Sequence, residues 1–173
     1  TELSKKLGLI PKMVEGRRVT DDDALEVAKM VFAGKINVEI LSALRAQGVR
    51  AVGLSGVDGN LLHAVRRPPK AMRDSATGET TMVDFGHVGD VTSADPHLVT
   101  LLVEHGYVPV ISSLGSDDEG NILNINADTV ASVIARSKAV ASRCLSARSS
   151  ASLRDGATSV QNATRAVAPG RIR

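Results

Sequence analysis

The sequence predicts an α/β protein, because helical and strand-like patterns alternate along most of its length. Apolar residues recur at spacings of three and four over residues 20–33 and again over 98–102. Between these stretches lie the apolar runs 49–56 and 107–114, which are typical of strands buried in a parallel sheet. We therefore expect a three-layer α/β/α sandwich with a largely parallel central sheet.

The composition is that of an ordinary globular protein. The chain has 173 residues, of which 43% are hydrophobic and 23% charged, so one domain with a real core is expected. A net charge of +2 gives no argument for nucleic acid or a membrane surface as a partner. The aromatic residues are only Phe32, Phe85 and Tyr107, too few for base-stacking platforms. We expect neither nucleic acid nor membrane binding.

Cysteine usage narrows the possible sites further. The single cysteine, Cys144, excludes an internal disulfide framework and a cysteine zinc site, and it fits a reducing cytoplasm. The four histidines show no metal-ligand spacing, so no metal site is expected from the protein itself. No run of eighteen apolar residues is present, so no membrane span is expected.

The first long helix is predicted to begin at Thr20. A threonine is a good N-cap, and Asp23 follows it in a capping-box relation. Gly34 is expected to end this helix, because glycine often occupies the position after the last helical turn. A second helix is expected over 37–47, with Gly48 as its stop.

The middle of the chain predicts strands joined by tight turns. A buried strand over 49–56 is followed by the turn signal Asp58-Gly59. Strands over 61–65 and 82–91 flank the basic, proline-containing stretch 66–70, which we expect to be an exposed loop. This part of the chain is interpreted as a hairpin-like excursion from the main sheet. The glycines of 53–59 have two possible interpretations. They allow the backbone to approach a ligand closely, or they form ordinary turns between elements.

Three short polar side chains stand where the strand-like pattern gives way to a last helix. A third helix is expected from Asp95 to Gly106, followed by the strand 107–114. After that strand, Asn124, Asn126 and Asp128 occupy alternate positions. Alternation in an extended chain directs side chains to one side, and a helix start adds free N–H groups there. Either the place binds an anionic ligand, or Asp128 caps the helix and the asparagines satisfy the turn.

The chain divides by composition near residue 137. Residues 1–136 carry the patterns above, whereas 137–173 are rich in serine, arginine and alanine without persistent periodicity. We expect 1–136 to form the folded domain. The stretch 137–173 is interpreted as the product of a shifted reading frame or truncated gene, or else as a disordered tail.

Six short segments, taken in order, resemble the amino acid kinase family. They are 16–21, 33–37, 51–59, 86–91, 106–112 and 124–128. Each motif is weak alone, but six in the family's order are specific, and together they cover roughly residues 7–136. The resemblance is to members that use ATP, with Mg²⁺, to phosphorylate the side-chain carboxylate of N-acetyl-L-glutamate in arginine biosynthesis. It implies a cytoplasmic homodimer or higher homo-oligomer.

The resemblance also implies roles for three residues. Arg18 matches an arginine that clamps the substrate's α-carboxylate, which suits a guanidinium fork. Asn124 matches the asparagine that binds the substrate's acetamido and carboxylate groups. Asp128 matches an aspartate that organises catalytic lysines.

The chain resembles the central, substrate-side part of such kinases. The family's glycine-rich N-terminal strand and its C-terminal nucleotide-binding half find no match in this sequence. Two alternatives therefore remain open. One is a family member acting on an aminoadipate derivative, aspartate or glutamate, and the other is a non-catalytic ligand-binding or dimer-forming fragment.

Overall fold

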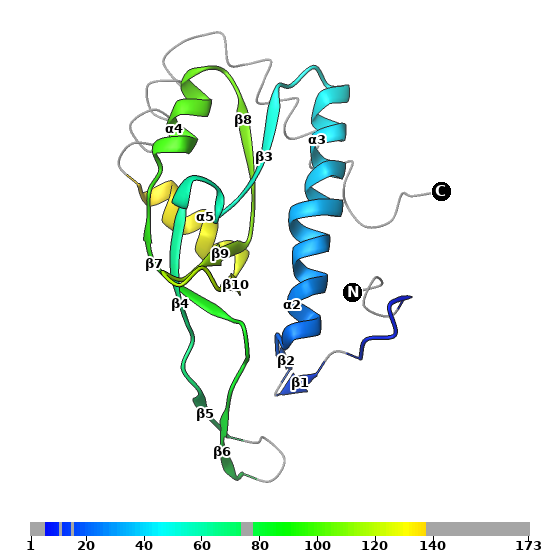
Figure 1. Ribbon diagram of the computed structural model, residues 1–173, viewed down its shortest axis with the longest axis vertical. Helices are drawn as coiled ribbons and strands as arrows, with labels where there is room; N and C mark the ends of the chain where they lie inside the picture. The colour runs from blue at the N-terminus through cyan, green and yellow to red at the C-terminus, as the bar shows by residue number, and fades with distance from the viewer. Residues whose placement is uncertain (1–5, 11, 15, 74–77, 138–173) are drawn as a thin grey trace.

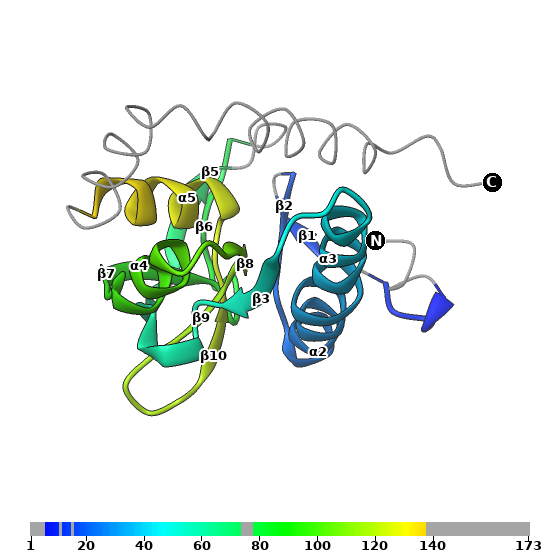
Figure 2. The same ribbon diagram turned by 90° about the horizontal axis from the view of Figure 1, so that it is seen from above.

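The helices lie on two sides of the strands, which confirms the α/β fold (Figure 1). A computed structural model describes residues 6–10, 12–14, 16–73 and 78–137. The expectations for the tail from residue 138 onward lie outside the described residues. Figure 2 shows one long helix on one side of the strands and α4 and α5 on the other.

One long helix runs along the molecule where two were predicted. Helix α2 (Asp22–Ala28), the π-helix η1 (Lys29–Ile36) and helix α3 (Asn37–Ala46) follow one another without a break. The prediction that Gly34 ends the first helix is therefore wrong.

A buried asparagine explains why the helix continues. Asn37 is only 4% exposed, and its Nδ2 donates to the carbonyl oxygens of Leu54 at 3.3 Å and Val110 at 3.2 Å. These bonds hold the helix against two strands, and tertiary contacts of this kind outweigh the weak helix propensity of a single glycine.

The cap of α2 also lies one residue from its predicted place. Asp21 has extended backbone angles, and its Oδ1 accepts a hydrogen bond from the N–H of Ala24 at 3.0 Å. Thr20, the predicted cap, is instead buried at 2% exposure. An aspartate and a threonine are similar N-cap residues, so local sequence does not separate them.

Apart from two short antiparallel hairpins, the strands form one parallel pair and one mixed sheet. Strands β3 (Ala51–Ser55) and β8 (Val108–Ser112) pair in parallel, as predicted. A four-stranded sheet has the order β10-β9-β4-β7. Its strands are β10 (Ile122–Asn124), β9 (Leu114–Ser116), β4 (Leu62–Arg66) and β7 (Gly89–Ala94). In it β9 runs parallel to β4, and the two outer pairings are antiparallel.

The core lies between the mixed sheet and helices α4 (His97–Glu104) and α5 (Ala127–Arg136). Its buried residues are aliphatic: Leu61, Leu62, Ala64, Val99, Leu123, Ile125, Val130 and Ile134. Val130 and Ile134 of the last predicted helix thus lie in this core. Within the described residues, no helix is long and apolar enough to cross a membrane.

The predicted hairpin excursion is confirmed. Strands β5 (Lys70–Arg73) and β6 (Thr80–Val83) pair antiparallel and project away from the body of the molecule (Figure 1). The stretch 66–70 was expected to be a solvated loop, but its first two residues form ion pairs. Arg66 pairs with Asp84 at 2.9 Å, and Arg67 pairs with Asp90 at 2.5 Å.

The Arg67–Asp90 pair should make part of the stability pH-dependent. Hydrogen bonding from Arg67 lowers the pKa of Asp90 below its ordinary 3.8. A lowered carboxyl pKa contributes stability that is present above the unfolded value and lost as the pH falls through the folded value. Since the side chains of Arg67 and Asp90 are 31% and 50% exposed, solvent screens the pair, and we expect it to contribute only about 0.5–1 kcal/mol to the free energy of unfolding.

Asp90→Asn should therefore lower the melting temperature at pH 7, where the wild-type carboxylate is charged. The deficit should shrink as the pH falls below 3.8. Thermal unfolding followed across this range measures it, and Arg67→Ala should show the same trend. A deficit equally large in acid would mean that the pair does not supply the effect.

Candidate functional site

Three segments far apart in the sequence meet beside the start of helix α2. The backbone N–H of Thr20 donates to the carbonyl of Phe85 at 2.9 Å, and its carbonyl accepts from the N–H of His87 at 2.7 Å. Asn124 is bonded to the same segment, residues 85–88, since its N–H donates to the carbonyl of His87 at 2.8 Å. Residues 85–88 thus form a short strip that is bonded to Thr20 and to Asn124.

A side-chain hydrogen bond closes this arrangement. Nδ2 of Asn124 donates to Oγ1 of Thr20 at 3.2 Å, across 104 positions of sequence. Sequence reasoning selected Asn124 but missed Thr20, because only a long-range contact gives this threonine its role. The strip therefore fixes both the backbone and the side chain of Asn124.

Gly86 is required for the close approach of the strip to Thr20. Its φ is +74°, a conformation that residues with a Cβ rarely adopt. A Cβ at this position would lie 2.2 Å from the carbonyl oxygen of Thr20. Glycine at 86 is thus demanded by packing and by backbone conformation together.

Arg18 and Asn124 line the same cavity. Strand β1 (Met13–Val14) and strand β2 (Arg17–Arg18) form a short antiparallel hairpin that leads into Thr20. The cavity has a volume of about 360 Å³, within the range of about 300–1,000 Å³ found for small-molecule pockets. Its polar lining residues are Lys12, Arg18, Thr20, Asp21, Asp23 and Asn124. An arginine and an asparagine thus line one cavity of suitable size.

The long helix supplies the apolar wall of the cavity. Residues of α2 and η1 form it together with the N-terminal segment: Leu9, Ile10, Val27, Ala28, Val31 and Phe32. Val31 and Phe32 belong to the π-helix, and π-helical turns are frequent at functional sites. The cavity therefore combines an apolar wall with a few polar groups, as ligand pockets commonly do.

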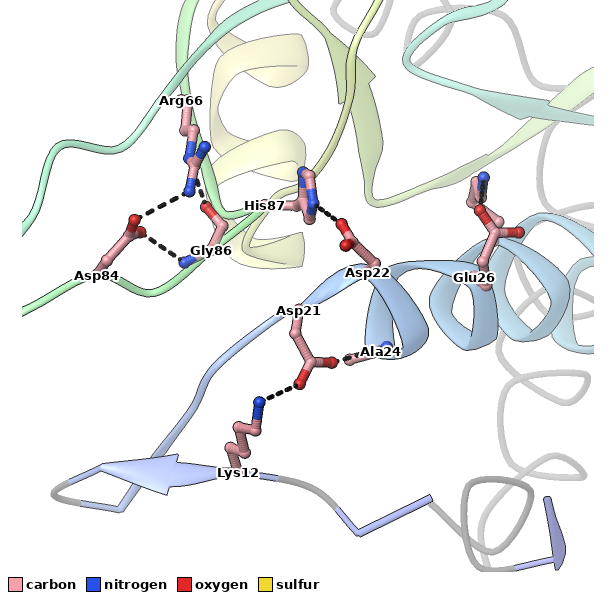
Figure 3. Close-up of polar contacts among 10 residues, drawn as sticks. Lys12, Asp21, Asp22, Ala24, Glu26, Arg66, Asp84, Gly86 and His87 are labelled. Atoms are coloured by element: carbon pink, nitrogen blue, oxygen red, sulfur yellow. Dashed lines mark hydrogen bonds and ion pairs between the residues drawn. The ribbon is translucent and has the colours of Figure 1, made fainter. Parts of the chain in front are cut away.

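A lysine that sequence reasoning missed also reaches this cavity. Nζ of Lys12 lies 3.2 Å from Oδ2 of Asp21 (Figure 3). The pKa of the Asp21 carboxyl is lowered, first by the hydrogen bond from the N–H of Ala24 and next by Lys12. The backbone N–H of Val19 donates to the carbonyl of Lys12 at 2.9 Å. These contacts tie the β1–β2 hairpin, and so Arg18, to the start of α2.

A second set of contacts ties the strip to the same helix start. Nε2 of His87 lies 2.6 Å from Oδ1 of Asp22 (Figure 3). Asp84 accepts from the N–H of Gly86 at 2.8 Å, and Nε of Arg66 donates to the carbonyl of Gly86 at 3.1 Å. The base of the β5–β6 hairpin thus orders the strip on which Asn124 rests.

Asp128 lies apart from this arrangement. It is exposed in the first turn of α5 and is not among the residues that line the cavity. The helix cap is Asn126, whose Oδ1 accepts from the N–H groups of Asp128 at 2.9 Å and Thr129 at 3.1 Å. The idea that Asp128 caps the helix is therefore wrong, as is the idea that those N–H groups are free for an anion.

The glycines of 53–59 are explained by packing. A Cβ on Gly53 would lie 2.2 Å from Oδ1 of Asn37, and one on Gly56 would lie 2.3 Å from the carbonyl oxygen of Leu114. These contacts favour the ordinary structural interpretation of both glycines. Within the part of the chain that the structure describes, no group of three His, Cys, Asp or Glu could hold a metal ion.

Comparison with known proteins gives a consistent result. The profile of the amino acid kinase family matches residues 1–164. The chain is 49% identical over 130 residues to an acetylglutamate kinase of Methanothermobacter thermautotrophicus, covering 75% of this chain and 44% of that protein. It is 50% identical over 135 residues to an acetylglutamate kinase of Symbiobacterium thermophilum, covering 78% and 44%. The chain spans about half the length of the curated relatives it matches.

Solved structures show the same fold. A protein of Streptococcus mutans UA159 superposes with a TM-score of 0.62 at 27% identity, over 78% of this chain and 49% of that one. An N-acetylglutamate synthase from Neisseria gonorrhoeae, solved with coenzyme A and N-acetyl-glutamate, gives 0.55 at 24% identity, over 78% and 28%. The second likeness supports the fold alone.

Proposed function

The chain belongs to the amino acid kinase family. From that premise we propose that it serves the ATP-dependent phosphorylation of the side-chain carboxylate of N-acetyl-L-glutamate, an early step of arginine biosynthesis. The observation that carries the proposal is the cavity shared by Arg18 and Asn124. Relatives of about 49% identity that are named acetylglutamate kinase support this substrate over aspartate, glutamate or an aminoadipate derivative.

The two residues would divide the recognition of the substrate between them. The guanidinium of Arg18 can hold a planar carboxylate by two charge-assisted hydrogen bonds. The amide of Asn124 can accept and donate beside the acetamido group. Phosphoryl transfer to a carboxylate depends on positioning and on charge compensation, so a rigid anchor for the unreactive end of the substrate favours the reaction.

ATP and Mg²⁺ are part of the proposal. ATP is the phosphoryl donor throughout kinase chemistry, and Mg²⁺ binds largely through the nucleotide's phosphates and water. We therefore propose that Mg²⁺ arrives with ATP.

Asp128 would act on turnover rather than on substrate affinity. It does not line the cavity of Arg18 and Asn124, and a carboxylate stabilises developing negative charge only by holding cations that do so. We expect Asp128→Asn to lower kcat at least tenfold with less than about a twofold change in the dissociation constant of N-acetyl-L-glutamate. Steady-state kinetics together with calorimetric titration would measure both. A change confined to affinity would reject this role.

Two further elements of the proposal concern setting and assembly. We propose a cytoplasmic location, as expected for amino-acid biosynthesis, and a homodimer or higher homo-oligomer. Apolar side chains exposed on the long helix, Met30 at 50% and Val38 at 62%, support an interface there. Light scattering of the purified chain tests the assembly, and a monomer at all concentrations would contradict it.

Ligand-dependent stabilisation tests the proposed substrate. The melting temperature should rise with N-acetyl-L-glutamate, because a ligand that binds only the folded state stabilises it. Free L-glutamate and L-aspartate at the same concentrations should give smaller shifts. A phosphorylation assay with ATP and each acid then separates a kinase from a ligand-binding fragment. Equal shifts with all three acids would contradict the proposed specificity.

A further inference from the structure

His87 is bonded to residues on both sides of the cavity that Arg18 and Asn124 line. Its N–H donates to the carbonyl of Thr20 at 2.7 Å, and its own carbonyl accepts from the N–H of Asn124 at 2.8 Å. Its ring contacts a different element, since Nε2 lies 2.6 Å from Oδ1 of Asp22 in the first turn of α2 (Figure 3). One residue therefore connects the backbone of Asn124 with the helix that lines the cavity.

The partner of the ring determines the direction of this hydrogen bond. An ionised carboxylate only accepts hydrogen bonds, so Nε2 of His87 carries the proton that lies between the ring and Asp22. A histidine commonly gains its second ring proton between about pH 5 and 8. The contact therefore exists in both charge states of the imidazole, and it is stronger when the imidazole is charged.

Three charged side chains contact His87 or its neighbour Gly86 among the residues that the structure describes. Asp22 accepts from the ring, Asp84 accepts from the N–H of Gly86, and Arg66 donates to the carbonyl of Gly86. The pKa of Asp84 is lowered first by that N–H, then by Arg66 and by the charge of His87. Since Asp84 also pairs with Arg66 at 2.9 Å, the hydrogen bond of the ring goes to Asp22.

The two sides of the cavity belong to different parts of the fold. Arg18 lies on the β1–β2 hairpin, which Lys12 ties to the start of α2, whereas Asn124 is bonded to the strip. A ligand that contacts both residues binds more tightly when their separation is already set, because binding then orders less of the protein. The contact between His87 and Asp22 joins the strip to α2 and so helps to set that separation.

We propose that His87 is a positioning residue whose contact with Asp22 holds the Asn124 side of the cavity against the Arg18 side. The inference rests on the proposed function, since both cavity residues must contact the ligand. The side chain of Asp22 is 95% exposed, so its replacement leaves the core intact, and water screens the contact. We therefore expect a moderate and pH-dependent effect on affinity.

Two single variants and their combination test the contact. The dissociation constant of N-acetyl-L-glutamate is measured by titration calorimetry at about pH 6 on the wild-type chain, His87→Ala, Asp22→Ala and the double variant. Each single variant should weaken binding about fivefold, and the double variant should bind no more weakly, because all three lack the same contact. Circular dichroism confirms folding, and the exposed Asp22→Ala carries the test if His87→Ala does not fold.

A matched variant controls for the removal of a charge from α2. Glu26 lies one turn after Asp22 and pairs with Lys29 on the same helix, and neither side chain of this pair meets the strip in the contacts described. Glu26→Ala should therefore bind N-acetyl-L-glutamate as the wild type does. A fivefold loss in Glu26→Ala as well would mean that the charge of the helix start, and not the contact with His87, controls affinity.

The pH dependence of binding separates this role from a purely structural one. The wild-type dissociation constant should be about threefold lower near pH 5.5 than near pH 8.5, because the imidazole is charged in acid. The profile should be flat for Asp22→Ala. It should be unchanged for His63→Ala, whose ring lies 3.4 Å from Asp118 and which is not among the residues that line the cavity.

Two outcomes would contradict the inference in different ways. A folded Asp22→Ala that keeps the wild-type affinity and the wild-type pH profile would overturn the role of His87 and leave the proposed function standing. A wild-type chain that does not bind N-acetyl-L-glutamate at any of these pH values would overturn both.

Discussion

Arg18→Ala should weaken the binding of N-acetyl-L-glutamate at least about a hundredfold. Arg18 lines the same cavity as Asn124, and its guanidinium would make two charge-assisted hydrogen bonds to the ligand's α-carboxylate. Such bonds contribute about 1.5–3 kcal/mol each, and 1.4 kcal/mol corresponds to a factor of ten in affinity. Calorimetric titration of the ligand into wild type and variant measures the change.

Two control variants separate the shape of the Arg18 side chain from its charge. Arg18→Lys keeps the charge and loses the planar fork, so it should recover only part of the affinity and remain about tenfold weaker than wild type. Arg45→Ala removes the same charge at an exposed position in the last turn of α3, and it should bind as wild type does. If Arg45→Ala weakened binding as much as Arg18→Ala, net charge rather than a specific contact would explain the effect.

Gly86→Ala should lower the free energy of unfolding more than the same substitution at Gly120, another glycine with a positive φ. The residue has a φ of +74°, and its new Cβ would lie 2.2 Å from the carbonyl oxygen of Thr20. A left-handed conformation costs a residue with a Cβ about 1–2 kcal/mol, and a clash with fixed backbone adds about 1–3 kcal/mol. We therefore expect a loss of several kcal/mol in the free energy of unfolding, measured by urea denaturation.

Gly120→Ala is the matched control for this glycine. Gly120 has a similar φ of +84°, and no heavy atom lies within 4 Å of a Cβ built on it. Its replacement should cost only the conformational part, about 1–2 kcal/mol. In any folded fraction, Gly86→Ala should also weaken N-acetyl-L-glutamate binding, because Thr20 and Asn124 rest on the same strip. Equal losses of stability in the two variants would mean that the close approach at Gly86 is tolerated.

Elements with strong local patterns were predictable from the sequence. The strand 49–56 is found as β3, and the helix with apolar positions Val130 and Ile134 is found as α5. The turn at Asp58-Gly59 and the β5–β6 hairpin after the basic stretch 66–70 were also predictable from local residues. In each case the pattern of apolar residues and turn residues lies within the element itself, so neighbouring residues contain the information.

The remaining features depend on contacts between distant residues. The residues around Gly34 predict that a helix ends there. The helix nevertheless continues through Gly34, because Asn37 is bonded to two strands. The residues around Thr20 predict that it caps a helix. In the structure Thr20 is buried instead, and its hydroxyl is bonded to Asn124. The family resemblance selected Arg18 and Asn124, which line one cavity, but no local pattern could indicate the strip, Lys12 or the hydroxyl of Thr20 beside them.

A crystal structure of the chain with N-acetyl-L-glutamate would show whether Arg18 and Asn124 hold this ligand. We expect ligand density in the cavity beside α2, with one carboxylate within hydrogen-bond distance of the Arg18 guanidinium and the acetamido group within hydrogen-bond distance of the Asn124 side chain. Density for the ligand elsewhere on the chain, with both side chains unengaged, would contradict it.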